Sequence, residues 1–510
     1  MAAATRQREP SDAYDLLVVG GGINGTGIAR DAAGRGLSVL LAERGDLAGS
    51  TSSSSTKLIH GGLRYLEYYE FRLVREALAE RERLLRLAPH VIWPLRFVLP
   101  HDEGLRPAWM LRLGLFLYDH LARLRTLPGS HGVDLRSSAY GAPLRKRLTR
   151  GFVYSDCWVE DSRLVVLNAM DARERGATVL TRTGVVSARR AAEGWVATLR
   201  DERVGAERTI RAKAVVNAAG PWVSATLGGT LGINSRAAVR LIKGSHIVVK
   251  RLFAGDQAYI LQQPDKRIIF AIPYERDFTL IGTTDVPYDG EPGPVSISAE
   301  ETDYLCGCIN RSFETTITPA DVVWSYSGVR PLYDDAAENA SAVTRDYVLD
   351  VEDQGGQAAV LSVFGGKITT YRRLAEHALE KLKPYFPHLK KAWTGDAVLP
   401  GGAMKDSDFD QFLAKLKAEK PFLPEETARR LARAYGTRAR DIVGTARSMA
   451  DLGEAFDGGL TAAEVDYLRT EEWAVTAEDI LWRRSKLGLR TSPESAARLA
   501  AYLDRRAEAA

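Results

Sequence analysis

The stretch Asp15-Leu16-Leu17-Val18-Val19-Gly20-Gly21-Gly22-Ile23-Asn24-Gly25 decides the fold class. Its first half is a short apolar run, which is typical of a buried strand, and its glycines indicate a tight turn into a helix over residues 25–35. A second apolar run at residues 37–42 ends on Glu43. Strand, glycine turn, helix and strand together predict a βαβ unit of a doubly wound α/β domain.

The spacing of Gly20, Gly22 and Gly25 is that of a dinucleotide-binding loop. Gly20 permits the tight turn, Gly22 lets the backbone approach a pyrophosphate, and Gly25 lets the helix lie close to the strand. The start of the helix offers free N–H groups and the positive end of its dipole to that phosphate. Glu43 is placed to accept hydrogen bonds from both ribose hydroxyls, and its charge disfavours the 2′-phosphate of NADP.

Two further loops favour FAD over NAD as the dinucleotide. The run from Ser50 to Lys57 supplies hydroxyls and backbone donors to an extended cofactor, and Gly365-Gly366-Lys367-Ile368-Thr369-Thr370 opens a helix that can face the pyrimidine edge of a flavin. Negative charge grows at that edge on reduction, where a helix start stabilises it. The predicted cofactor-binding residues are Gly20, Gly22, Asn24, Gly25, Glu43, Thr51, Ser52, Ser53, Lys57, His60, Gly61, Asp285, Gly366, Lys367 and Thr369.

Length and composition limit the number of domains and the kinds of partner that the protein can have. A chain of 510 residues is too long for one core, so two or three domains are expected, and 45% hydrophobic with 26% charged residues is typical of a folded soluble protein. The net charge of +4 gives no reason to expect nucleic-acid binding. No signal peptide and no spanning helix is predicted, so any membrane contact is expected to be peripheral. Three cysteines without CxxC spacing predict inert thiols in a reducing cytoplasm and no metal site.

Short β-rich runs at residues 246–249, 258–261, 267–270 and 279–281 predict an antiparallel sheet inserted into the dinucleotide domain. Beyond a Pro-Gly linker near residue 400 the sequence turns helical. We therefore expect three regions: a discontinuous FAD-binding Rossmann domain at residues 14–90, 150–235 and 350–395, an antiparallel substrate-binding region at residues 91–149 and 236–349, and an all-α domain at residues 400–510.

Six long motifs are spread over nearly the whole chain. They are Gly20-Gly21-Gly22-Ile23-Asn24-Gly25, Lys57-Leu58-Ile59-His60-Gly61-Gly62-Leu63-Arg64-Tyr65, Ile242-Lys243-Gly244-Ser245-His246, Ile281-Gly282-Thr283-Thr284-Asp285, Ser327-Gly328-Val329-Arg330-Pro331 and Phe364-Gly365-Gly366-Lys367. In this order and spacing they resemble the family of bacterial aerobic, FAD-dependent sn-glycerol-3-phosphate dehydrogenases, from about residue 14 to about residue 490.

The resemblance implies oxidation of glycerol 3-phosphate to dihydroxyacetone phosphate, with the electrons passed from FADH2 to a membrane quinone. It implies an FAD-binding domain of the glutathione reductase type, an antiparallel substrate domain and a helical C-terminal domain. It also implies a homodimer that is attached peripherally to the inner face of the cytoplasmic membrane.

A phosphate dianion needs fixed cations, and arginine suits it because its planar fork donates two hydrogen bonds at once. Arg330, held on a turn before a proline, is the first candidate for the phosphate. By resemblance Arg345, Arg64, Tyr65 and Lys367 join it as substrate-binding residues. A single arginine is more often a solvated surface charge, and Arg345 can instead serve to pair with the aspartate that follows it.

Loss of the hydroxyl proton needs a base, and a neutral histidine is suited to that role near pH 7. His246 is the first candidate for the base or for a substrate ligand, and His60 is its rival. A lone histidine is more often structural. Lys367 is suited to stabilise the reduced flavin or the forming ketone oxygen. The predicted catalytic set is therefore His246, Arg330 and Lys367.

The segment at residues 105–125 predicts a helix that is apolar and aromatic around most of its surface. Arginines at both ends, together with Trp109, Phe116 and Tyr118, fit a helix lying in a lipid interface, while a helix buried within the protein is the alternative.

Three other functions stay open at this point. They are a glycerol-3-phosphate oxidase using oxygen, an amine or amino-acid oxidase of the same fold, and a flavoprotein without catalysis. An amino-acid oxidase should need fewer cations than Arg64, Arg330, Arg345 and Lys367 supply, and a non-catalytic flavoprotein leaves the histidine motifs without a role.

Overall fold

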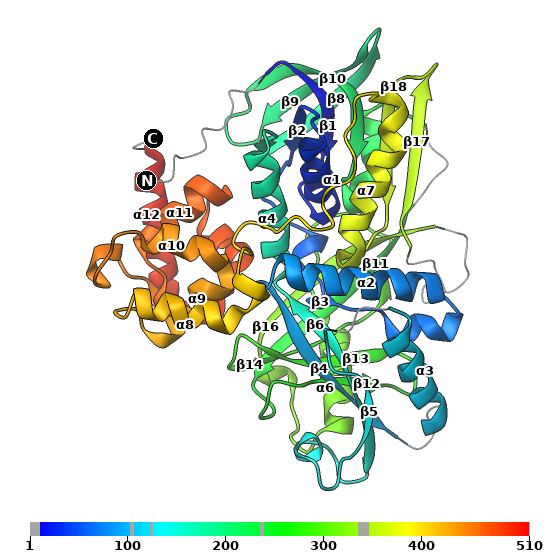
Figure 1. Cartoon of the computed structure of the whole chain (residues 1–510), viewed down its shortest axis with the longest axis vertical. Helices are drawn as coiled ribbons and strands as arrows, with labels where there is room; N and C mark the ends of the chain where they lie inside the picture. The colour runs from blue at the N-terminus through cyan, green and yellow to red at the C-terminus, as the bar shows by residue number, and fades with distance from the viewer. Residues whose placement is uncertain (1–10, 103–106, 123–125, 235–238, 335–345, 509–510) are drawn as a thin grey trace.

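The computed structural model describes residues 11–102, 107–122, 126–234, 239–334 and 346–508, apart from the side chains of residues 64, 67 and 68. Within these ranges the chain forms two sheets, helices that cover them, and a lobe of C-terminal helices on one side (Figure 1).

The first sheet is built on β1 (Ala13–Val19), the strand that the opening stretch predicts. β1 pairs in parallel with β2 (Val39–Ala42) and with β10 (Glu207–Asn217). Leu16, Leu17 and Val18 are fully buried, as expected of a central strand covered on both faces. The parallel order is β18-β10-β1-β2-β7, with β17 antiparallel at the edge and β8 and β9 extending antiparallel from β10. The other strands are β7 (Thr178–Leu180), β8 (Thr183–Ala191), β9 (Gly194–Asp201), β17 (Val348–Gln354) and β18 (Gln357–Phe364).

Three helices, α1 (Ile23–Gly34), α4 (Asp161–Glu174) and α7 (Tyr371–Leu382), share one core with one face of this sheet. The predicted βαβ unit is thereby confirmed, with α1 starting at residue 23 instead of 25 and β2 starting at residue 39 instead of 37. The opposite face is covered by the β8–β9 hairpin, whose Trp195 is buried and donates its indole N–H to the carbonyl oxygen of Ala359 at 3.1 Å.

The second sheet has the order β15-β11-β14-β13-β12-β4-β6-β3, with β16 paired to β11 and β5 paired to β6. The four predicted β-runs form β11, β12, β13 and β14, which confirms an antiparallel sheet here. Among the described strands of this sheet, β12 and β4 pair in parallel, which the long connection between them permits. The strands are β3 (Leu58–Ile59), β4 (Ile92–His101), β5 (His131–Asp134), β6 (Arg150–Val159), β11 (Val239–Lys250), β12 (Ala258–Gln262), β13 (Ile268–Tyr274), β14 (Phe278–Gly282), β15 (Val286–Pro287) and β16 (Val322–Tyr333).

Two strands assigned by the predicted bounds to the FAD-binding domain, β3 and β6, pair within the second sheet. β6 lies antiparallel to β4, from Ile92 opposite Val159 to His101 opposite Arg150. β3 pairs with β6 on the side away from β4. The boundary near residue 150 would therefore cut a continuous sheet. The division into three domains otherwise stays a prediction.

The second sheet is covered by α2 (Phe71–Leu87) and α3 (Ala108–His120) on one face and by α6 (Ala299–Ser312) on the other. The sequence of residues 67–87 is typical of a charged amphipathic helix, but α2 begins at residue 71, because residues 63–68 form a 3-10 helix first. α6 starts at a capping box in which Ser298 and Glu301 bond each other's backbone N–H groups. In Figure 1, α2 runs across the junction between the two sheets.

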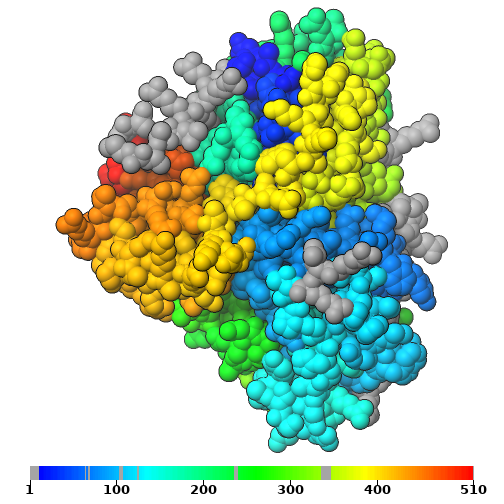
Figure 2. Space-filling model, viewed as in Figure 1, coloured from blue at the N-terminus to red at the C-terminus, as the bar shows by residue number. Residues whose placement is uncertain are grey.

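The C-terminal residues form a separate helical lobe, orange to red in Figures 1 and 2, beside α4. This confirms the predicted all-α region. Its elements are α8 (Phe409–Glu419), α9 (Glu425–Tyr435), α10 (Ala439–Val443), α11 (Ala462–Glu472), a π-helical stretch (Asp479–Arg484) and α12 (Pro493–Glu508); a short helix, α5 (Val223–Ala225), lies outside this lobe.

The three cysteines are buried and unpaired. Burial raises the pKa of Cys306, and raises the pKa of Cys308 to about 11. A buried thiol that stays protonated is a poor nucleophile, which agrees with the prediction of inert thiols.

Candidate active site

The glycine loop between β1 and α1 has room for backbone but not for side chains. Gly20 has φ +109°, and a Cβ there would lie 2.5 Å from the carbonyl oxygen of Ala218. A Cβ on Gly25 would lie 1.9 Å from the carbonyl oxygen of Gly20. Both contacts are far inside van der Waals distance, so glycine is required at each position. The first N–H groups of α1 emerge from this turn without intrahelical acceptors, which makes the turn a candidate phosphate site.

Glu43 closes the loop from the end of β2. Its carboxylate accepts hydrogen bonds from the backbone N–H groups of Gly21 and Gly45, each at 2.6 Å. Burial raises the pKa of Glu43, and these two N–H groups oppose that shift. Each carboxylate oxygen keeps a further lone pair. The carboxylate is therefore fixed at the strand end where the sequence predicts a ribose contact.

Asn24 joins the glycine loop to the loop that follows β18. Its side-chain N–H donates to the carbonyl oxygen of Gly365 at 3.1 Å. Gly366 has φ +100°, and a Cβ there would lie 2.9 Å from the same amide nitrogen. Among the described residues, Asn24 Oδ1 is buried without a hydrogen-bond partner. An unpaired buried acceptor costs about 1–3 kcal/mol, so a donor from a bound group fits this position.

The serine-rich loop lies against the same helix start. Ser52 Oγ accepts from the backbone N–H of Ile23 at 3.0 Å, and Thr51 Oγ1 donates to the carbonyl oxygen of Val329 at 2.6 Å. Lys57 contacts this loop through its side chain, whose ammonium donates to the carbonyl oxygen of Ser53 at 3.1 Å. Its ammonium is fully buried, 2.9 Å from Asp161 Oδ1. In this position Lys57 supports the loop, and a direct contact with the cofactor stays a prediction.

Arg330 lies on β16 next to this loop. Its guanidinium donates to Thr283 Oγ1 at 2.9 Å and to the carbonyl oxygen of Thr284 at 3.2 Å, and it forms an ion pair with Asp285. A Cβ on Gly244 would lie 1.9 Å from Arg330 Nη2, so the glycine of the Ile242–His246 motif leaves space for the arginine. The side chain is 26% exposed, which leaves part of its fork accessible to an anion.

Lys367 and Tyr65, both predicted to bind substrate, are in contact. The Lys367 ammonium lies 3.9 Å from the centre of the Tyr65 ring, a cation–π contact. A Cβ on Gly365 would lie 3.7 Å from the carbonyl oxygen of Pro331, so the loop of Lys367 adjoins β16 just after Arg330. Arg330 lies within this strand, and not on the turn that the sequence predicts. The Lys367–Tyr65 contact and the strand of Arg330 are thus neighbours through the backbone of Gly365 and Pro331.

His246 is enclosed on all sides. It is 1% exposed, its Nε2 lies 3.0 Å from Thr56 Oγ1, and its ring stacks on Tyr326 with centroids 4.7 Å apart. A Cβ on Gly282 would lie 2.2 Å from the His246 ring, so this glycine makes space for it. Burial, and then the charges of Arg330 and Lys57, hold the pKa of His246 well below its usual range. The imidazole is therefore neutral, but it shows neither ring nitrogen to solvent.

His60 follows the serine-rich loop along the chain, directly after β3. Its backbone N–H donates to Thr369 Oγ1 at 3.3 Å, which joins it to the Gly366 loop, and the residue is half-buried. The next residue, Gly61, donates its N–H to the hydroxyl of Tyr118 on α3 at 2.7 Å. Tyr118 in turn donates to Asp156 at 2.7 Å. The His60–Gly61 loop therefore links the candidate site to α3.

Two predicted substrate residues cannot be placed, because the side chain of Arg64 and all of Arg345 lie outside the described residues. Three residues that shape the site were missed by the sequence prediction: Thr56 beside His246, Asp161 under the serine loop, and Thr283 beside Arg330. Thr56 and Thr283 stand inside or next to quoted motifs, which is a usable signal. Asp161 has no such signal, because it is a single acid at a helix start.

Comparison with known proteins shows the family of the chain. The model of the family "FAD dependent oxidoreductase" matches residues 15–372, and that of the "C-terminal domain of alpha-glycerophosphate oxidase" matches residues 392–508. A glycerol-3-phosphate dehydrogenase of Pseudomonas aeruginosa is 56% identical over 493 residues, covering 97% of this chain and 95% of its own. The aerobic glycerol-3-phosphate dehydrogenase of Escherichia coli is 52% identical, covering 96% and 97%.

This chain belongs to the FAD-dependent glycerol-3-phosphate dehydrogenase family. One relative has another substrate in its name, a D-erythritol 1-phosphate dehydrogenase of Brucella abortus that is 54% identical over 92% of this chain and 94% of its own. A solved glycerol-3-phosphate dehydrogenase of Bacillus halodurans, complexed with FAD, has TM-score 0.75 and 26% identity over 98% of this chain and 95% of its own. FAD is accordingly the cofactor of this family member.

None of the helices within the described residues is long and apolar enough to cross a bilayer.

Proposed function

We propose that this protein oxidises sn-glycerol 3-phosphate to dihydroxyacetone phosphate, with FAD as the first electron acceptor. Bound FAD supplies the acceptor for the hydride that leaves the secondary carbon. The observation that supports the substrate class most directly is Arg330, which is held by Thr283 and Asp285 and partly exposed, on a strand whose next residue, Pro331, adjoins the loop of Lys367. The names of the relatives from P. aeruginosa and E. coli, which match almost the whole chain, support the same substrate.

In this proposal Arg330 and Lys367 bind the phosphate dianion. Asp285 and Thr283 already hold the Arg330 fork in one orientation, so little side-chain entropy is lost when an anion binds. Tyr65 keeps the Lys367 ammonium above its ring, close to the loop expected to face the flavin. Arg64 and Arg345 are proposed to complete the phosphate site.

The hydroxyl proton of the substrate needs an acceptor within hydrogen-bond reach. His246 is neutral but enclosed, and its Nε2 is engaged with Thr56. We therefore propose that His246 orients Thr56 and, through it, the serine-rich loop. His60 is half-buried beside the Gly366 loop, and we propose it as the base.

We further propose that α3 attaches the protein to a membrane surface, where a quinone takes the electrons. Trp109, Leu113 and Phe116 are spaced four and three residues apart, on one face of α3, and are 67%, 50% and 48% exposed. The same helix buries Leu115 and Tyr118 against the second sheet. An apolar aromatic face of this kind suits a lipid interface. A homodimer and an inner-membrane location belong to the same proposal.

D-erythritol 1-phosphate is a second candidate substrate, since the B. abortus relative is as similar as the glycerol-3-phosphate dehydrogenases. Both compounds present a phosphate and a neighbouring polyol, which the same cations would bind. Turnover of the two phosphates with a soluble electron acceptor separates them. We expect glycerol 3-phosphate to give the larger kcat/KM, and a larger value for the four-carbon compound would reverse the assignment.

The electron acceptor is tested in the same preparation. Anaerobic addition of a quinone analogue should reoxidise the reduced protein faster than air-saturated buffer does. Faster reoxidation by oxygen would make the protein a glycerol-3-phosphate oxidase. Solved glycine oxidases and the amino acid oxidase NikD share the fold at 15–19% identity, which supports no such activity here.

A further inference from the structure

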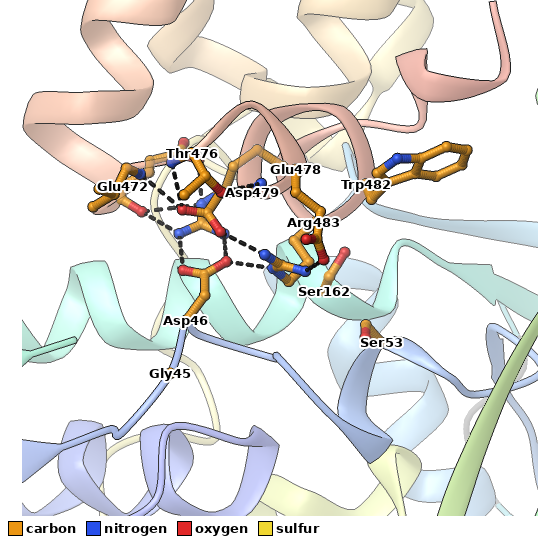
Figure 3. Close-up of polar contacts among 12 residues, drawn as sticks. Gly45, Asp46, Ser53, Ser162, Glu472, Thr476, Glu478, Asp479, Trp482 and Arg483 are labelled. Atoms are coloured by element: carbon orange, nitrogen blue, oxygen red, sulfur yellow. Dashed lines mark hydrogen bonds and ion pairs between the residues drawn. The ribbon is translucent and has the colours of Figure 1, made fainter. Parts of the chain in front are cut away.

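The C-terminal lobe contacts the first sheet through a cluster of buried charges directly behind Glu43. We define this cluster as Asp46, Arg182, Asp479, Arg483 and Arg484. Figure 3 shows Asp46 pointing out of its loop toward the helix that carries Asp479 and Arg483. This helix comprises residues 477–484 and ends in the π-helical stretch Asp479–Arg484.

Asp46 is 2% exposed and accepts hydrogen bonds from two arginines of the C-terminal lobe. Arg484 donates to Asp46 Oδ1 at 2.7 Å and to Oδ2 at 2.8 Å, a two-pronged contact, and Arg483 Nε donates to Oδ2 at 2.6 Å. Arg484 is fully buried and its Nε donates to the carbonyl oxygen of Glu472 at 3.0 Å. The orientation of Asp46 is therefore fixed from the C-terminal side.

A second tie reaches the neighbouring segment of the first sheet. Arg182 Nη2 donates to both carboxylate oxygens of Asp479, at 2.7 and 2.8 Å. The backbone N–H of Arg182 donates to the carbonyl oxygen of Gly45 at 2.8 Å, and the N–H of Thr183 donates to that of Glu43 at 2.8 Å. The lobe thus holds both sides of the loop at residues 43–48.

This loop in turn holds the glycine loop. Glu43 accepts from the N–H of Gly21 at 2.6 Å, and the N–H of Ala48 donates to the carbonyl oxygen of Gly21 at 3.1 Å. Gly21, the residue before Gly22, is therefore hydrogen-bonded through its N–H to Glu43 and through its carbonyl to Ala48, and these two residues lie on either side of Asp46 in the sequence. A displacement of Asp46 is therefore expected to be passed to Gly21 through Glu43 and Ala48.

A contact that served only to join the lobe to the first sheet would be expected to use apolar side chains instead of charged ones. Burying charges carries a desolvation penalty that apolar side chains would avoid, so buried ion pairs are weak evidence for stability. They do fix geometry, because a two-pronged arginine–carboxylate contact tolerates little displacement.

We infer that Arg484 and Asp46 are positioning residues for FAD, through which the C-terminal lobe sets the geometry of the adenosine-binding loop. The inference rests on the proposed contact of Glu43 with the adenosine ribose. It gives the lobe a part in cofactor retention, in a region where the sequence itself shows no chemistry.

The test compares Asp46→Asn with the unaltered full-length protein. Asn keeps the shape of the side chain but removes the charge, so the two arginines lose their acceptor pair. We expect FAD to leave the holoprotein at least about tenfold faster than it leaves the unaltered protein. The rise in flavin fluorescence on release measures this rate. After removal of FAD, ADP should compete for reconstitution about tenfold more weakly, while the affinity for FMN, which lacks the adenosine half, should stay within about twofold.

Glu471→Gln is the matched control. It breaks another ion pair between α4 and the lobe, Arg173 with Glu471 at 2.6 Å, which has no contact with the loop at residues 43–48. Its FAD release and ADP affinity should equal those of the unaltered protein. If Asp46→Asn fails to fold, Arg484→Lys, which keeps the charge and loses the fork, takes its place with the same expectations.

Unchanged FAD release in a folded variant would overturn the inference. Equal loss of affinity for ADP and FMN would also overturn it, because that pattern indicates general loosening and not a displaced adenosine site. None of these measurements uses glycerol 3-phosphate, so a protein that binds FAD as expected but does not oxidise this substrate would contradict only the proposed function.

Discussion

Arg330 is held by three oxygen acceptors before any substrate arrives: Asp285, Thr283 Oγ1 and the carbonyl oxygen of Thr284. This arrangement explains how a single arginine on a strand can be ready for a phosphate. The neighbouring carboxylate leaves part of the fork accessible, since the Arg330 side chain is still 26% exposed.

Replacing Arg330 with Ala should raise KM for glycerol 3-phosphate about 10- to 100-fold, since a charge-assisted contact worth about 1.5–3 kcal/mol is lost. Steady-state kinetics with a soluble acceptor measure this change. Arg136→Ala, which removes an arginine paired with Asp134 at the surface, is the control and should leave KM unaltered. An unchanged KM in Arg330→Ala would remove this residue from the phosphate site.

His246 gives a prediction on pH. Burial, then Arg330 and Lys57, depress its pKa, so it stays neutral at any pH near or above 6.5. An acidic limb near pH 6.5 in the kcat/KM profile cannot come from His246 and should persist in His246→Gln, even if the rate falls. Disappearance of that limb in the variant would show that His246 titrates in the working range, contrary to its buried position.

At the scale of elements, α3 is the helix whose exposed side has no role in the fold. Changing Trp109, Leu113 and Phe116 together to Ser should lower binding to vesicles containing anionic lipid by at least about tenfold, because roughly 1.5–3 kcal/mol of burial is lost per large side chain. Sedimentation with the vesicles measures binding. The control is Val204→Ser, at another exposed apolar residue. Equal sedimentation of the triple variant and the unaltered protein would refute membrane attachment by α3, and a change of oligomeric state instead would assign this face to a dimer.

Elements that are local in sequence could be predicted, and contacts between distant elements could not. The β1–α1–β2 unit and Glu43 follow from one continuous stretch, because strand, turn and helix signals lie side by side. The bond from Asn24 to Gly365 and the parallel pairing of β12 with β4 join segments far apart, and nothing in either segment indicates the other. The start of α2 was predicted too early, because a 3-10 helix has the same local composition.

In the candidate site, too, residues within motifs could be predicted and their contacts with distant residues could not. Arg330, Lys367 and His246 were named from motifs, yet the ion pair with Asp285 and the enclosure of His246 depend on packing between strands and could not be read from the sequence. The buried Lys57–Asp161 pair is the clearest case: lysine stood in a motif, but its partner, at the start of α4, carried no signal.

At the scale of the whole molecule, the C-terminal lobe meets α2 and β4 around His90. This fully buried histidine lies between Gly401 and Gly436; a Cβ on either glycine would lie 3.0 Å from its ring. Burial, and then Arg163 and Arg433, lower its pKa to about 3. The unfolded chain therefore binds one more proton than the folded chain between pH 3 and 6.5, and stability present above pH 6.5 is lost as the pH falls.

His90→Gln removes this dependence. Between pH 6.5 and 5, the unaltered protein should lose about 2 kcal/mol of unfolding free energy more than the variant does. Urea unfolding at the two pH values measures the difference, and the comparison cancels other titrating groups. The same loss in both proteins would mean that His90 is not buried as a neutral ring.

We propose that glycerol 3-phosphate passes its electrons to FAD bound between the two sheets. The most direct test is anaerobic addition of glycerol 3-phosphate to the purified holoprotein, with the absorbance of oxidised flavin followed at about 450 nm. We expect the band to bleach at a rate that saturates with substrate, and to bleach far more slowly in Arg330→Ala at low substrate. A flavin that stays oxidised with saturating glycerol 3-phosphate would contradict the account.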